Sequence, residues 1–291
     1  MPTNKIDLGR VGVWTFAFDR LGLADVRDAA REVEQLGYGA LWIGEAAGRE
    51  SLTHAALLLD ATDRIVIASG IARIGERSPR VMRAAQRALA EAHPGRYLLG
   101  LGGSNQLGSG RDPATAMADY LDQMAAAPYT PPAAAPSPIV LGAHCTAMLR
   151  LAAARTHGSH TYLVTPANTA RARRVLGPSP ILAAEQAVVL QTDPTAARTI
   201  ARRHLAFYAQ LPHFQANFAH AGLTPEDWQH ECSDRLVDAV VAWGDETAIA
   251  ARVRAHLQAG ASHVCIQPLE HRPNAGLDTL CQLAPGLTAL G

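Results

Sequence analysis

Four times along the chain, a helical pattern ends in a glycine, and a short apolar run follows within a few residues. The glycines and runs are Gly37 before Ala40–Ile43, Gly95 before Tyr97–Leu99, Gly158 before Thr161–Val164 and Gly260 before His263–Ile266. Glycine ends helices because its backbone readily takes the left-handed conformation found just after the last turn. Further strands are predicted at Val11–Phe16, Ile65–Ile71, Ile139–Leu141 and Ile181–Leu190. About eight strands alternating with helices predict an α/β fold, a (β/α)8 barrel; the pattern alone leaves a doubly wound open sheet as an alternative.

Composition favours one soluble enzyme-sized domain, residues 1–291. The chain has 291 residues, of which 48% are hydrophobic, enough for a single large core. The 26 basic and 26 acidic residues cancel, and no basic run exists, so a nucleic-acid partner is not expected. No apolar run approaches the roughly 18 to 20 residues that cross a bilayer, so a membrane role is not expected either.

Cysteine usage and the first residues predict a cytoplasmic protein. The four cysteines are far apart and form no CxxC pair: Cys145, Cys232, Cys265 and Cys281. The start MPTNKIDLGR lacks the apolar stretch of a signal peptide. We therefore expect reduced cysteines.

Two segments interrupt the alternation of strands and helices. Pro128–Pro138 is rich in proline and alanine and is expected to be an extended connector. Residues 195–242 predict a helical excursion before the last strand, of the kind that forms a lid or an oligomer interface. We expect the interface, and hence a homodimer, because of an aromatic patch formed by Phe207, Tyr208, Leu211, Phe214 and Phe218.

The stretch from Arg64 to Asn105 predicts a site as well as a fold. Its first strand runs into Ala68-Ser69-Gly70 and its second into Gly102-Gly103-Ser104. Small residues at the carboxyl ends of parallel strands let a ligand lie against the backbone. In a barrel, the working groups follow the strands, and the candidates are Trp14 to Phe16, Glu45, Ser69 to Ile71, Gly102 to Asn105, Gly142 to His144, Thr165 with Pro166, Glu185 with Gln186, and Gln267.

Several segments in this order resemble the luciferase-like monooxygenase superfamily. They are ALWIGEAAGRE from Ala40, the Arg64–Asn105 stretch, YLVTPANTARARRVLG from Tyr162 and SDRLVDAVVAWGDETAIAARVRAHLQAGASHVCIQ from Ser233. Within it, the chain is similar to the actinobacterial branch of probable coenzyme F420-dependent oxidoreductases. The resemblance implies a (β/α)8 barrel that transfers hydride between the deazaflavin F420 and a small organic substrate. The alternatives are an FMN-dependent monooxygenase and a degenerate barrel that binds without catalysing.

The resemblance places the cofactor ring against Ser69-Gly70-Ile71. Family members carry a bulge there with a cis peptide, here between Gly70 and Ile71; the alternative is a plain β-bulge. Gly102 and Gly103 permit close approach of the cofactor's ribityl or phosphate, and Ser104 is a candidate donor to it. The alternative is an ordinary tight turn.

Two helix starts are candidates for the cofactor's anionic tail. Gly142-Ala143-His144 stands where relatives carry a small-residue loop that opens the phosphate-binding helix, and His144 is a spare cation or acid. Thr165-Pro166 predicts a helix whose first amides point at an anion, although Thr-Pro is more commonly a simple N-cap.

Glu45 and Trp14 complete the candidate set. The resemblance places Glu45 near the reactive edge of the ring, where it could orient the ring or relay a proton; the alternative is a surface glutamate paired with Arg49. Trp14 is either a face of the pocket or core packing.

Other chemistries have little support. No HExxH or GxSxG occurs, so a metalloenzyme or a serine hydrolase is not expected. The non-catalytic alternative rests on two departures from the family, a short loop after Asn105 and the absence of Gly-Pro at Gly142-Ala143.

Overall fold

The computed structural model describes residues 6–103, 111–132, 135–269, 274 and 276–290. Parallel strands form a closed barrel at its centre, because β10 pairs with β1 on one side and with β8 on the other. The barrel strands are β1 (Val11–Thr15), β2 (Ala40–Ile43), β3 (Val66–Ser69), β5 (Tyr97–Gly102), β6 (Ile139–Gly142), β7 (Gly158–Thr161), β8 (Ile181–Leu190) and β10 (His263–Pro268). The predicted (β/α)8 barrel is confirmed, and the open sheet is excluded.

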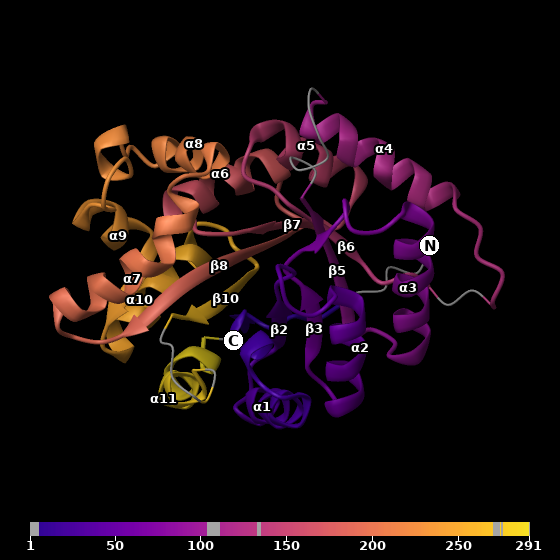
Figure 1. Ribbon diagram of the computed structural model, residues 1–291, viewed down its shortest axis with the longest axis horizontal. Helices are drawn as coiled ribbons and strands as arrows, with labels where there is room; N and C mark the ends of the chain where they lie inside the picture. The colour runs from indigo at the N-terminus through magenta and orange to yellow at the C-terminus, as the bar shows by residue number, and fades with distance from the viewer. Residues whose placement is uncertain (1–5, 104–110, 133–134, 270–273, 275, 291) are drawn as a thin grey trace.

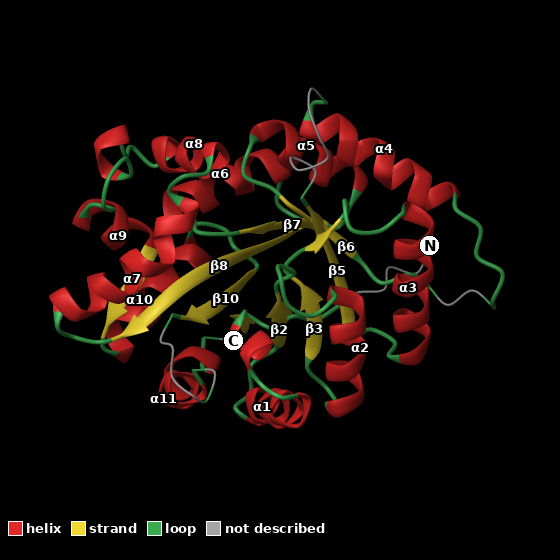
Figure 2. Ribbon diagram, in the orientation of Figure 1, coloured by secondary structure: helices red, strands yellow, loops and turns green. Residues whose placement is uncertain are grey.

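Helices surround the barrel in a closed ring (Figure 1). Each packs against the next in the order α1 (Leu23–Gln35), α2 (Ser51–Ala61), α3 (Pro79–Ala92), α4 (Pro113–Ala126), α5 (Thr146–Arg155), α6 (Pro166–Leu176), α10 (Glu246–Gln258) and α11 (Leu277–Thr288). Figure 2 shows the strands at the centre and the helices outside them. The starts follow from local chemistry: at α3, for example, the Ser78 hydroxyl accepts the Val81 N–H and Pro79 takes the first position. None of the helices described is long and apolar enough to cross a membrane.

Apolar side chains fill the space on both sides of the strands. Residues such as Leu41, Leu99 and Leu141 point outward and pack on the helices. Trp14, Trp42 and their neighbours form a separate cluster inside the barrel. Successive side chains along each strand therefore alternate between the core inside the barrel and the core between the barrel and the helices.

The predicted excursion is helical, and a strand ends it. It contains α7 (Pro194–Tyr208), α8 (Pro212–His220), the 3-10 turn η3 (Pro225–Asp227) and α9 (Asp234–Val240), followed by β9 (Val241–Gly244). Strand β9, which the sequence analysis missed, pairs with the second half of β8 outside the barrel. Figure 1 shows α7, α8 and α9 gathered on one side of the molecule.

The aromatic patch of the excursion faces inward, contrary to expectation. Phe214 and Phe218 are buried, Tyr208 and Leu211 are half-buried, and of the five only Phe207 is exposed, at 65%. The rings pack against one another and against Tyr162, which follows β7. The patch therefore packs within this chain and gives no support for an oligomer interface, and the homodimer stays a prediction.

One predicted strand begins earlier than expected. Gly37, Gly95 and Gly260 have φ of 86°, 75° and 102°, as helix-ending glycines should. Gly158 instead begins β7, and a Cβ built on it would lie 1.9 Å from the Ile181 carbonyl oxygen of β8. It is glycine because two strands approach closely there, so β7 precedes the predicted run at Thr161–Val164.

The proline-rich connector is confirmed where it is described. Residues 128–132 and 135–138 contain no helix or strand, and β6 begins at Ile139. All four cysteines are free.

Candidate functional site

The third barrel strand bulges at the mouth of the barrel. Ala68 is opposite Leu98 and Ala72, in the short strand β4 (Ala72–Arg73), is opposite Leu101. The chain thus advances four residues where β5 advances three, which is a β-bulge at Ser69–Ile71. The peptide between Gly70 and Ile71 is cis. Both features that the resemblance implied are confirmed.

The glycines of β5 and β6 make room for this bulge. A Cβ on Gly100 would lie 2.0 Å from the Ser69 carbonyl oxygen, and one on Gly102 would lie 2.6 Å from the Ile71 side chain. At Gly142 the corresponding contact with Ile71 is 3.2 Å. The small residues at these strand ends therefore leave room for the Ile71 side chain.

The turn after β5 is described only as far as Gly103. Gly103 has φ of 77°, a left-handed conformation that favours glycine. Ser104, predicted as a donor to the cofactor, lies outside the described residues.

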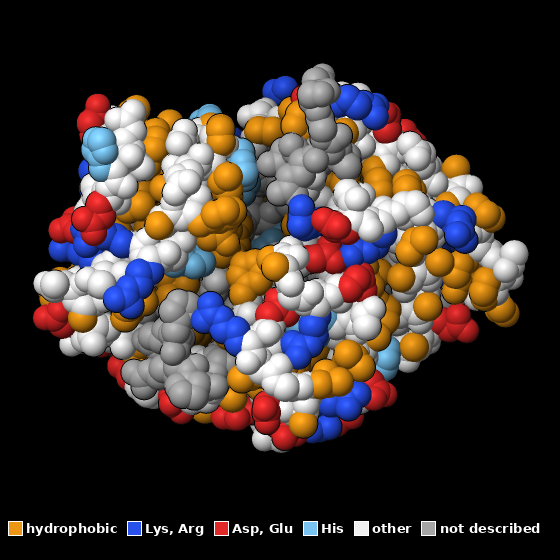
Figure 3. Space-filling model, viewed as in Figure 1, with side chains coloured by type: hydrophobic (Ala, Val, Ile, Leu, Met, Phe, Trp, Pro, Cys, Tyr) orange, Lys and Arg blue, Asp and Glu red, His pale blue; other side chains and the backbone are white. Residues whose placement is uncertain are grey.

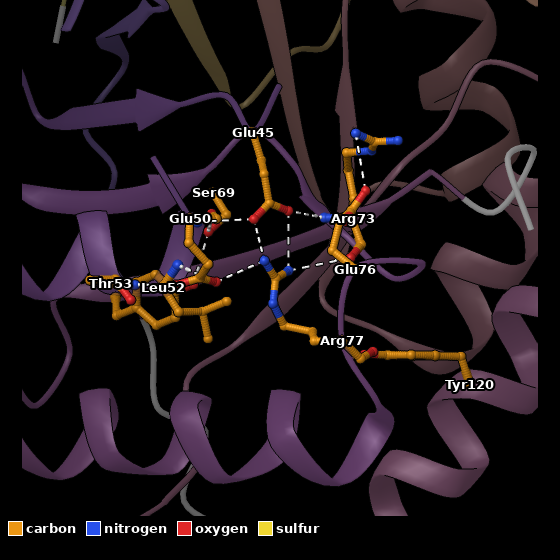
Figure 4. Close-up of polar contacts among 11 residues, drawn as sticks. Glu45, Glu50, Leu52, Thr53, Ser69, Arg73, Glu76, Arg77 and Tyr120 are labelled. Atoms are coloured by element: carbon orange, nitrogen blue, oxygen red, sulfur yellow. Dashed lines mark hydrogen bonds and ion pairs between the residues drawn. The ribbon is translucent and has the colours of Figure 1, made fainter. Parts of the chain in front are cut away.

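Glu45, at the end of β2, belongs to an ion-pair network behind the bulge (Figure 4). Its carboxylate accepts N–H bonds from Ser51 at 3.0 Å and Arg73 at 2.6 Å, and it pairs with Arg77. The Glu45 and Arg77 side chains are nearly buried, and Arg77 also pairs with Glu50 at 2.7 Å. These partners raise the pKa of Arg77 although burial opposes them. Glu45 thus ties β2 to the start of α2 and to the turn before α3.

The expected partner of Glu45, Arg49, lies elsewhere. Arg49 donates to the carbonyl oxygens of Phe18 and Leu21 at 2.6 and 2.7 Å. The pairing with Arg49 was wrong, because the fold brings Arg77 across from the third βα loop. A position at the reactive edge of a ring remains a proposal for Glu45.

A second hydrogen-bond chain reaches the bulge itself. The Ser51 hydroxyl donates to the Ser69 hydroxyl at 2.9 Å, and Ser69 bonds to the Tyr97 hydroxyl at 2.8 Å. All three groups are buried, and burial raises the pKa of Tyr97. Ser69 is thereby fixed immediately before the Gly70–Ile71 peptide.

Trp14 lies in the barrel beside the bulge. It is buried, and its ring packs against Phe16 and Tyr162 with centroids 4.5 and 5.0 Å apart. A Cβ on Gly70 would lie 2.5 Å from Trp14 Nε1. Trp14 is therefore core packing and pocket wall together, the two interpretations that the sequence left open.

Glu185 on β8 carries a buried carboxyl group inside the barrel. Its Oε2 accepts the Leu163 N–H at 2.8 Å, and among the described residues its buried Oε1 has no hydrogen-bond partner. Burial raises its pKa to about 8, so the carboxyl is largely protonated at pH 7. The signal in the sequence was a glutamate in the middle of the apolar strand ILAAEQAVVL.

His144 packs under the excursion and carries no charge near neutral pH. Its ring centroid lies 5.2 Å from that of Phe214 and 6.4 Å from that of His213. Burial, together with the neighbouring His213 and Arg171, lowers its pKa to about 3. At this pKa the ring brings no positive charge near neutral pH, contrary to the expectation of a cation, and a catalytic role for His144 stays a prediction.

The two predicted anion-binding helix starts differ. At α5 the N-cap residue is the exposed Cys145, which makes no side-chain cap, and Arg171 donates to the neighbouring His144 carbonyl at 2.7 Å. At α6, Thr165 and Asn168 form a complete capping box, and Asn168 donates to Asn217 of α8 at 3.1 Å. The first amides of α6, after Thr165, are thus covered by the capping box and by α8. The first amides of α5, after Gly142-Ala143, receive no side-chain cap.

Aromatic side chains of the excursion border the mouth. The Tyr162 hydroxyl donates to Gln267 Oε1 at 2.8 Å. The ring centroids of Tyr208 and Phe214 lie 5.3 and 6.3 Å from that of Tyr162. In Figure 3 the surface is hollowed beside the orange side chains of this region. The wall of the mouth is therefore mainly apolar, with hydroxyl and amide groups at a few points.

Comparisons with known proteins agree with this architecture. Residues 10–125 match the family model of luciferase-like monooxygenases. A comparison with curated proteins found no match. Among solved structures, an F420-dependent secondary alcohol dehydrogenase in complex with an F420-acetone adduct is 14% identical, with a TM-score of 0.75 over 97% of this chain and 99% of that one.

Two further structures show the breadth of this likeness. A coenzyme F420-dependent tetrahydromethanopterin reductase from Methanopyrus kandleri is 16% identical, with a TM-score of 0.75 over 97% of this chain and 99% of that one. The oxygenating constituent of the Pseudomonas putida 3,6-diketocamphane monooxygenase, in complex with FMN, is 15% identical, with a TM-score of 0.70 over 96% and 98%. The chain thus has the luciferase-like (β/α)8 barrel, with the sequence pattern of luciferase-like monooxygenases over residues 10–125.

Proposed function

We propose that this chain is an oxidoreductase that transfers hydride between coenzyme F420 and a small organic substrate. The observation that carries the proposal is the bulge at Ser69–Ile71, placed at the barrel mouth of a chain with the luciferase-like pattern. The F420-dependent enzymes among the similar structures support the choice of cofactor.

The residues present fit a flat ring with an anionic tail. Gly70 and the half-buried Ile71 side chain offer an apolar floor for one face of the ring. The uncapped start of α5 offers free amides for a phosphate, and the Arg171 guanidinium adds the charge that His144 lacks. The closed start of α6 does not fit this role, so Thr165 and Pro166 are left to position α6.

The chain's own groups would orient the substrate and exclude water. When bound, F420 supplies the hydride acceptor or donor at C5 of its deazaflavin ring. Trp14, Tyr162 and Phe214 form a mainly apolar wall in which polar interactions are strengthened. Glu185 keeps its proton on a buried carboxyl group, behind Leu163.

The anion site is tested by salt dependence and a matched pair of arginines on α6. Arg171→Gln should weaken binding of both F420 and FMN, whereas Arg174→Gln, an exposed position on the same helix, should not. F420 binding should also fall more steeply with salt than FMN binding, because F420 carries glutamate carboxylates beyond its phosphate. Equal affinities for both variants and the parent would place the anion site elsewhere.

An FMN-dependent monooxygenase is the second candidate, favoured by the FMN-bound structure among the similar ones. It would use the same floor and the same anion site. Oxygen consumption by the flavin-loaded protein separates the two, because deazaflavin hydride transfer consumes none. Cytoplasmic location and a homodimer remain predictions, and sedimentation analysis tests the latter.

A further inference from the structure

The interior of the barrel contains two tryptophan–histidine pairs of the same chemistry. In the first, Trp42 Nε1 donates to His263 Nε2 at 3.0 Å, and His263 Nδ1 donates to the Gly9 carbonyl at 2.9 Å. In the second, His160 Nδ1 donates to the Ala183 carbonyl at 3.2 Å, and Trp14 is the nearby indole. The first pair is closed by a direct hydrogen bond. The second is open.

The open pair has one donor and one acceptor, both beside the Gly70 backbone. Trp14 Nε1 and His160 Nε2 are both buried without a hydrogen-bond partner among the described residues. A Cβ built on Gly70 would lie 2.5 Å from the first atom and 3.3 Å from the second, so both border the bulge. Indole nitrogen only donates, and a neutral histidine that donates through Nδ1 only accepts at Nε2. A group that satisfies both must accept one hydrogen bond and donate another, as a hydroxyl does.

The surroundings of the open pair favour an uncharged ligand. Its neighbours are the rings of Trp42, stacked on His160 at 4.4 Å, and of Phe16 and Tyr162, packed on Trp14. Burial lowers the pKa of His160 to about 3, so this histidine brings no positive charge near neutral pH. An ionic ligand here would lose its hydration without gaining a counter-charge.

We propose that Trp14 Nε1 and His160 Nε2 form a binding subsite for a hydroxyl group, and that the barrel mouth takes an uncharged, mainly apolar alcohol. The alcohol oxygen accepts from Trp14 and its proton is donated to His160. The proposal names a substrate class for the proposed function. The hydroxyl subsite stands without that function, whereas the statement that the alcohol is the substrate rests on it.

Nitrogen-15 NMR of the indole groups tests the subsite directly. Benzyl alcohol should shift the Trp14 Nε1–H resonance, identified by its loss in Trp14→Phe, and should leave that of Trp42 in place. Toluene tests the need for the hydroxyl, and benzylamine and benzoate test the preference for an uncharged ligand. The titration is made on the protein alone and again with F420, so failure of cofactor binding is seen separately from failure of the subsite.

Two histidine variants give the matched comparison. His160→Phe keeps a ring against Trp42 but removes the acceptor, and it should weaken benzyl alcohol binding about 2- to 10-fold, as expected for one neutral hydrogen bond, with toluene unchanged. His54→Phe is the control, because His54 on α2 is equally buried with an unpartnered Nε2. Circular dichroism confirms that both variants fold.

Several results would overturn the proposal. A Trp14 shift that toluene reproduces, or equal benzyl alcohol affinity in His160→Phe, would show that no hydroxyl is held there. Benzoate or benzylamine binding as tightly would refute the preference for uncharged ligands. If no probe binds with or without F420, the pair holds a resident water only.

Discussion

Glu185→Gln should make the protein more stable than the parent, by an amount that grows with pH. The Glu185 carboxyl is fully buried, and its pKa rises from 4.5 to about 8 on folding. Between these values the folded state binds a proton that the unfolded state has released, so the parent loses stability as pH rises. The slope for this one group is about 1.4 kcal/mol per pH unit. Over the whole interval the loss is of the order of 5 kcal/mol, as an upper bound.

Glutamine keeps the shape and the acceptor for the Leu163 N–H but does not titrate. Urea unfolding of both proteins at pH 5, 6, 7 and 8 measures the difference between their free energies of unfolding. The effects of pH on other groups cancel in this difference because the two proteins share those groups. Glu91→Gln, at an exposed position on α3, is the control and should show a much smaller trend. A difference for Glu185→Gln that stays constant across this range would refute a buried, protonated carboxyl group.

Three substitutions and one matched comparison test how the barrel is built, each by denaturant unfolding. Gly158→Ala places a Cβ 1.9 Å from a β8 carbonyl oxygen and should lower the free energy of unfolding by more than about 3 kcal/mol. Gly286→Ala, with open space around it in α11, should raise the free energy of unfolding by about 0.5–1 kcal/mol. Similar effects of the two substitutions would contradict the close approach of the strands at Gly158. Arg77→Met leaves the Glu45 carboxylate buried without its cation and should cost about 3–5 kcal/mol, so a change below about 1 kcal/mol would show that the pair is effectively solvated. Thr165→Ala breaks the α6 capping box and should cost about 1 kcal/mol while leaving cofactor affinity unchanged; a large loss of affinity would return the anion to α6.

Local signals in the sequence predicted most of the fold. Helix-ending glycines at Gly37, Gly95 and Gly260 marked three αβ loops correctly, because a left-handed residue after a helix is a local requirement. Gly158 gave the same signal for a different reason, its close approach to β8, which is a contact between strands distant in sequence. Strand β9 was missed because four residues directly after a helix show no period of their own.

The site was predicted less completely, for the same physical reason. The bulge at Gly70–Ile71 was found through the family resemblance, and Trp14 through its strand end. The partner of Glu45 was wrong, and His144 was assigned a charge that its burial removes. Which side chain meets another, and how dry their surroundings are, depends on packing between elements that no local pattern specifies.

Equilibrium titration of the protein with F420 and with FMN, followed by fluorescence, tests the proposed activity most directly. The proposed function predicts saturable binding of one cofactor per chain, with F420 bound more tightly than FMN. Tighter binding of FMN would favour the monooxygenase. Binding of neither would contradict a redox role and leave a barrel that binds other molecules without this chemistry.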